Sequence, residues 1–134
     1  MELFYLKKEI KRLVKKHSIV ITTKRFKGPS GRSWVSPKII KIPRLITIEN
    51  IALTFHEIGH IVLNHVKSKK ALYIEEYEAE QYALKKLREF NVHRYEREAY
   101  KKYLARAKRY VKNHISEDEE KVRKTILNWC KNAT

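Results

Sequence analysis

Apolar residues near the start of the chain recur every three or four positions. On a helical projection they share one face with His17, whereas basic residues fill the other faces; the apolar members are Leu3, Leu6, Ile10, Leu13 and Val14. This period is typical of an amphipathic helix that buries one face. We therefore predict a helix over residues 2–17.

The pattern then changes to short runs that favour strands. Residues 19–23 are β-branched throughout and predict a strand. A turn is predicted at 28–31, a short strand at 33–36 and a further strand at 38–42. Because prolines flank the last run and proline cannot donate to a sheet ladder, we expect 38–42 to be an edge strand.

Helical patterns return in the second half of the chain. Residues 48–65 are apolar on nearly every side, which indicates a buried helix. Gly59 in the middle of this helix costs roughly 1 kcal/mol of helix propensity relative to Ala. That cost indicates that another backbone or a substrate passes close to Gly59. Further helices are predicted at 72–90 and 94–113.

The end of the chain predicts one more helix. Ser116 and Glu119 form a capping box at its start, and its apolar residues are Val122, Ile126, Leu127 and Trp129. Together the segments predict an α+β fold, with a small twisted antiparallel or mixed sheet, an N-terminal backing helix and C-terminal helices.

Composition limits the class of protein. The 134 residues suffice for one hydrophobic core. The single cysteine, Cys130, excludes an intramolecular disulfide framework, and the start of the chain has no signal-peptide pattern. No apolar run reaches the length of a membrane-spanning helix, so we expect a soluble cytoplasmic protein. Abundant Lys, Arg and Glu, with one Asp, one Gln and one Met, are typical of proteins from hot environments.

The charge is uneven along the chain. The formal net charge is +16, and residues 1–70 contain sixteen Lys and Arg against four Glu. A basic half can attract nucleic acid, anionic membrane or acidic peptides. The preferred interpretation is a solvated surface on a thermostable protein.

Candidate chemistry is concentrated in the string HEIGH at 56–60, which is an HExxH motif. On a helix, positions four apart place His56 and His60 on one face, so both imidazoles can reach one ion. Glu57 points about 100° round the same turn, where it can act as general base for the attacking water. The motif predicts a metal-dependent hydrolytic site.

A catalytic zinc needs a third protein ligand, and His65 is the first candidate. Metzincins use HExxHxxGxxH, which would place Gly at 63 and His at 66, but this chain has Leu63 and Val66. His65 would also point to the opposite side of the predicted helix. We therefore interpret His65 as a polar residue near a helix C-terminus.

The second source of a ligand is a run of glutamates on the helix at 72–90. Periodicity places Glu76 and Glu80 in the middle of an apolar stripe, and Glu75 and Glu78 on the flank or back. A core-facing carboxylate is costly unless a metal or a partner compensates it. One zinc beside the two histidines would explain both residues; the alternative is ion pairing with Lys or Arg at the edge of the core.

The segments HEIGH (56–60) and EYEAE (76–80) resemble the gluzincin zinc metallopeptidases, in which HExxH is followed by ExxxD on a second helix. The resemblance implies that His56, His60 and Glu76 bind one Zn²⁺ per chain and that Glu57 is the general base. It also implies that Glu80, which replaces the usual Asp, orients a ligand imidazole.

Small size, soluble character and composition make the chain most similar to the minigluzincins, the jannalysin/abylysin group of archaea. The resemblance implies a zinc-dependent endopeptidase that hydrolyses peptide or protein substrates. It also implies a catalytic domain over 1–115 and a C-terminal helical segment over 116–134 that holds the enzyme as a latent zymogen. That segment would block the cleft of its own chain or exchange between the chains of a homodimer. An edge strand at 38–42 could pair with an extended substrate.

Two other classes of function stay open. The chain could be a nucleic-acid-associated zinc protein that uses its basic face and the helix at 94–113, whose tyrosines are Tyr95, Tyr103 and Tyr110. It could also be a catalytically inactive regulatory module.

The remaining polar residues have no assigned role in the predicted site. Cys130 could be a fourth zinc ligand that blocks the site, although a lone C-terminal cysteine is usually not a ligand. No group is assigned to stabilising the oxyanion. His93, His114 and the tyrosines are interpreted as structural or surface residues.

Overall fold

The computed structural model describes residues 3–22, 33–35, 38–42, 44–115 and 122–132. In chain order the elements are α1 (Phe4–Lys16), β1 (Val20–Thr22), β2 (Ser33–Val35), β3 (Lys38–Lys41), α2 (Ile48–Val62), η1 (His65–Lys67), α3 (Leu72–Glu89), α4 (Val92–Tyr95), α5 (Arg97–Asn113) and α6 (Lys124–Lys131). The predicted turn at 28–31 and the capping residues Ser116 and Glu119 lie outside the described residues.

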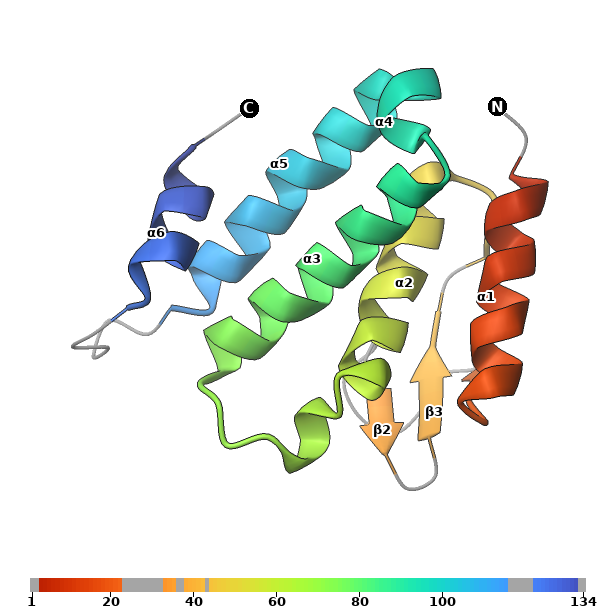
Figure 1. Cartoon of the computed structure of the whole chain (residues 1–134), viewed down its shortest axis with the longest axis horizontal. Helices are drawn as coiled ribbons and strands as arrows, with labels where there is room; N and C mark the ends of the chain where they lie inside the picture. The colour runs from red at the N-terminus through yellow and green to blue at the C-terminus, as the bar shows by residue number, and fades with distance from the viewer. Residues whose placement is uncertain (1–2, 23–32, 36–37, 43, 116–121, 133–134) are drawn as a thin grey trace.

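Helix α2 is at the centre of the fold. It contacts α1, α3, α5, β2 and β3, and its residues Ile51, Ala52, Phe55 and Ile58 are fully buried. Figure 1 shows α6, α5 and α3 side by side, α2 behind α3, and α1 at the opposite side of the molecule from α6. The prediction of a buried helix is confirmed, so a polar side chain on α2 is held in a fixed place.

The α+β class is confirmed, but the sheet is not antiparallel throughout. Its strand order is β1-β3-β2. Strand β1 runs parallel to β3, with Val20 opposite Ile39, and β2 runs antiparallel to β3, with Trp34 opposite Ile39.

The prediction that 38–42 is an edge strand is wrong, because β3 lies between the other two strands. A substrate strand therefore cannot pair at β3. The prediction rested on the flanking prolines, which lie outside the described residues.

Helix α3 packs closely on α2 at Gly59. A Cβ atom built on Gly59 would lie 3.1 Å from Cβ of Tyr82. The close neighbour inferred from the sequence is thus a side chain of α3, rather than a backbone or a substrate. This close packing brings the glutamates of α3 near the histidines of α2.

Helix α6 begins later than the sequence predicted. Its N-cap is Arg123, whose backbone N–H donates to the Tyr73 hydroxyl at 3.1 Å. Val122, which the sequence placed inside this helix, therefore precedes it. The helix instead packs into a small cluster, the α6 cluster, formed by Tyr73, Ile74, Val111, Ile126 and Cys130.

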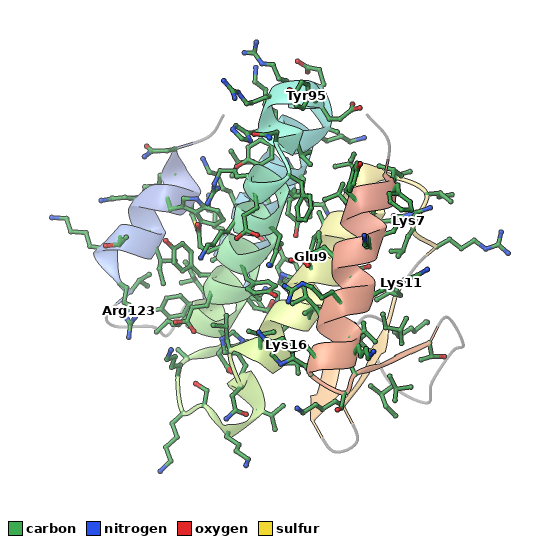
Figure 2. The ribbon with its side chains drawn as sticks, turned by 45° about the vertical axis from the view of Figure 1, so that its right-hand side comes forward. Lys7, Glu9, Lys11, Lys16, Tyr95 and Arg123 are labelled. Carbon is green, nitrogen blue, oxygen red and sulfur yellow. The ribbon has the colours of Figure 1, made fainter. Side chains whose placement is uncertain are left out.

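Helix α1 is joined to α3 by an ion pair. The Lys86 ammonium lies 2.8 Å from Oε2 of Glu9, and Figure 2 shows Glu9 on the side of α1 opposite Lys7 and Lys11. Hydrogen bonding by Arg12, on the next turn, is the main influence on the pKa of Glu9. Together with Lys86 it outweighs burial, so that this pKa falls to about 2.

We expect Glu9→Gln to lower the free energy of unfolding at pH 7 by about 1 kcal/mol, because the pair is only partly buried. The folded pKa of Glu9 is depressed, so the stabilisation is present above the unfolded value of 4.5 and is lost as pH falls toward about 2. Urea unfolding at several pH values in this window should show wild type and variant converging. A difference that is the same at every pH would contradict this account, and Glu89→Gln, which alters an exposed partner of Lys86, is the control.

Candidate metal centre

The two motif histidines face each other on α2. Nε2 of His56 and Nε2 of His60 are 3.1 Å apart, and His56 is only 4% exposed. His56, Glu57 and His60 present ligand atoms that all lie within 4.8 Å of one another, so this group could hold a metal ion. The helical spacing predicted from HExxH is confirmed.

Glu76 reaches the same point from α3. Its Oε2 lies 2.9 Å from Nε2 of His56 and 3.3 Å from Nε2 of His60. The residue is 7% exposed, as its place in the apolar stripe predicted. One carboxylate oxygen and two imidazole nitrogens therefore converge in a buried space.

Glu80 fixes the orientation of His56. Its Oε1 lies 2.7 Å from Nδ1 of His56 and also accepts a hydrogen bond from the hydroxyl of Tyr103 on α5. An ionised carboxylate can only accept, so Nδ1 of His56 must donate. In the neutral form of the ring, which is the form that a metal ion would bind, Nε2 carries no proton and faces Glu76.

These atoms fit a bound cation. Oε2 of Glu76 is buried and has no hydrogen-bond partner among the described residues, although two imidazole nitrogens are close to it. Ligand atoms around a tetrahedral zinc, with bonds of about 2.0–2.1 Å, lie about 3.3 Å apart, and the three separations here are 2.9, 3.1 and 3.3 Å. A shared cation would satisfy all three acceptors at once.

The electrostatics favour positive charge at this point. Burial alone would lower the pKa of the His56 imidazole, but Glu76 and Glu80 outweigh burial and raise it to about 10. Burial would raise the pKa of Glu76, yet the two histidines lower it well below its ordinary value. The carboxylates that attract a proton to His56 would equally attract a metal cation.

Glu57 belongs to the group that could hold a metal ion, but its surroundings also suit it to proton transfer. Its Oε2 is buried, and no residue in the described part of the chain forms a hydrogen bond with it. Burial raises its pKa to about 7, against the opposing effect of the neighbouring histidines. A carboxylate with a pKa near the working pH is suited to accept and release a proton.

His65 does not point away from the motif histidines, as the sequence had suggested. Helix α2 ends at Val62, and Asn64 takes a left-handed φ of 56°, which turns the chain back. Nδ1 of His65 then lies 2.8 Å from Nδ1 of His60. The expectation failed because it assumed that the helix continues to residue 65.

Two tyrosines of α5 also reach the site. Tyr103 is 1% exposed and binds Glu80, and the Tyr110 ring lies 5.6 Å from the His56 ring. Burial, and then the negative charge of Glu76, raise the pKa of Tyr110. Tyr95, which the sequence placed on the same helix, instead ends α4; it is 72% exposed and stands at the end of the molecule in Figure 2.

Two residues considered from the sequence have other surroundings. Cys130 packs among the apolar residues of the α6 cluster. Glu78 pairs with Lys70 at 2.8 Å and with His65 at 3.0 Å. Neither contact involves His56 or His60.

Comparison of the chain with protein-family models, with curated proteins and with solved structures gave no match. Within the described part of the chain, none of the helices combines the length and apolar character that a membrane span requires.

Proposed function

We propose that the chain is a zinc-dependent endopeptidase of the gluzincin type. The observation that carries the proposal is the convergence of Nε2 of His56, Nε2 of His60 and Oε2 of Glu76 within 3.3 Å. Two imidazoles and one carboxylate are a donor set used by catalytic zinc sites. The order of HExxH and ExxxE along the chain supports the same assignment.

The protein residues have distinct roles in this proposal. His56, His60 and Glu76 would hold zinc, which supplies a Lewis acid that polarises the scissile carbonyl and lowers the pKa of water. Glu57 takes the proton from the attacking water and passes it to the leaving amine. Glu80 and Tyr103 hold the His56 ring in place.

The experiment that tests the proposal combines metal analysis with peptide cleavage. We expect about one zinc per chain, and cleavage of unstructured peptides that stops when a chelator removes the metal. Bound zinc without turnover, even after C-terminal trimming, would favour an inactive regulatory module. Salt-dependent retention on nucleic acid would favour a nucleic-acid-associated protein.

We further propose that the C-terminal segment keeps the enzyme latent. Tyr110, near the end of α5, lies against His56, and the α6 cluster packs on the next residue, Val111. Its buried residues form a cluster distinct from the main core, and Trp129 of α6 packs against both, so α6 is attached through a small contact area that suits a detachable element. In this proposal α6 anchors the end of α5, and Tyr110 obstructs the site.

Truncation after Ile115 is expected to raise peptide cleavage relative to the full-length chain, because it removes the anchor of α5. Circular dichroism and the cleavage rate measure the two relevant properties. A folded truncate with no greater activity would exclude latency. An unfolded truncate would show that α6 simply completes the fold.

A further inference from the structure

A series of polar contacts connects the candidate metal centre to the protein surface through His65. Nδ1 of His60 is 2.8 Å from Nδ1 of His65, and Nε2 of His65 is 3.0 Å from Oε1 of Glu78. Glu78 in turn accepts from the Lys70 ammonium at 2.8 Å. His65 is 6% exposed, so water does not readily replace these contacts.

The outermost contact of this series, between Glu78 and Lys70, determines which imidazole nitrogens of His65 and His60 carry a proton. Glu78, paired with Lys70, is an ionised carboxylate and can only accept a hydrogen bond. Nε2 of His65 must therefore donate to Glu78. A neutral imidazole carries one N–H, so Nδ1 of His65 is an acceptor, and Nδ1 of His60 donates to it. The remaining nitrogen of His60, Nε2, then has a free lone pair.

We propose that His65 is a positioning residue for the metal site, accepting the Nδ1–H of His60 and so keeping Nε2 of His60 unprotonated and directed at the ion. The inference rests on the proposed function only in taking the occupant of the site to be a metal ion. It assigns His65 a role that its place outside the HExxH motif does not suggest.

The physical benefit is that both ligand rings are held in the same tautomer. Glu80 accepts from Nδ1 of His56, and His65 does the same for His60. Ligand histidines almost always donate their second N–H to such a partner, and losing the partner typically weakens metal affinity by about 10–100-fold. Without an acceptor, His60 could rotate or carry its proton on the nitrogen that faces the ion.

Two amide variants of the full-length chain separate the two hydrogen bonds of His65. The side-chain amide of Asn occupies nearly the same position as Nδ1 of histidine, so His65→Asn keeps an acceptor for the N–H of His60. The side-chain amide of Gln occupies nearly the same position as Nε2 of histidine, so His65→Gln keeps the donor to Glu78 but loses the acceptor for His60. The control is His17→Asn, which removes a histidine that caps α1.

The first measurement is the dissociation constant for Zn²⁺, by competition with a chelating dye. We expect His65→Gln to weaken binding by about 10–100-fold, His65→Asn to weaken it several-fold less, and His17→Asn to have no effect. Wild-type affinity in His65→Gln would overturn the proposal. Equal losses in both variants would also overturn it, because they would indicate a packing effect.

The second measurement is the tautomer of His60 in the metal-free wild-type chain, from nitrogen–proton NMR correlations of the imidazole. A proton on Nδ1 supports the proposal, and a proton on Nε2 overturns it. This result decides the proposal even if the variants fail to fold. This measurement also separates the role of His65 from the proposed function. A protein that binds no zinc would contradict the proposed function, whereas the His60 tautomer would still test the role of His65.

Discussion

Glu57→Gln is expected to lower the rate of peptide cleavage by about 10²- to 10⁴-fold, the range for loss of a general base, while zinc content stays at the wild-type level. The Glu57 carboxylate has a buried oxygen that forms no hydrogen bond with the residues the structure describes. It makes none of the described contacts that orient His56, His60 or Glu76. Gln preserves the volume of the side chain but cannot accept the proton.

The cleavage rate should be measured in whichever form is active, full-length or trimmed, with zinc determined on the same samples. Glu49→Gln makes the same chemical change in the first turn of α2, where Glu49 is partly exposed, and should leave the rate unchanged. Retained cleavage in Glu57→Gln would exclude Glu57 as the base. Loss of zinc together with cleavage would instead identify Glu57 as a ligand.

The helices could be predicted because their apolar periods are long and regular. Residues 2–17 and 72–90 contain several turns each, and the observed helices α1 and α3 differ from these bounds by only a residue or two. The order of the strands could not be predicted in this way. Pro37 and Pro43 suggested an edge, but strand order depends on pairing between segments far apart in the chain.

Periodicity also sorted the glutamates of α3 correctly. Glu76 and Glu80 are 7% and 4% exposed, whereas Glu75 and Glu78 are only partly buried. The prediction that residues of this stripe are buried is wrong for Leu72, which is 57% exposed because it is the first residue of α3. A helical projection therefore shows which side chains share a face, but not where that face begins to be covered.

The surroundings of His60 and of Glu80 required the three-dimensional structure. His65 reaches His60 only because the chain turns at Asn64, and left-handed Asn is not evident from a hydrophobic pattern. Tyr103 and Tyr110 are seven residues apart and share a face of α5. That spacing was a usable signal, but their partners lie on other helices, so the sequence did not show what they contact.

Glu76→Gln is expected to weaken zinc binding by more than the roughly 10–100-fold that losing an outer partner costs, because it neutralises the carboxylate that we propose as a direct ligand. Among the described residues, the Glu76 carboxylate has an oxygen within 3.3 Å of both imidazole nitrogens. Its negative charge also balances the positive charge of the ion in a buried site. Gln can place an oxygen at the same point, but without that charge.

The measurement is the zinc dissociation constant, with circular dichroism of the metal-free variants to separate ligand loss from unfolding. Glu75→Gln is the matched control on the same helix and should retain wild-type affinity, because Glu75 is not among the residues that converge on the histidines. Glu78→Gln should cost far less than Glu76→Gln, since Glu78 acts only through His65. Wild-type affinity in Glu76→Gln would remove Glu76 from the ligand set. Glu57, which also lies beside the two histidines, would then be the carboxylate ligand, and Glu57→Gln would lose zinc rather than only activity.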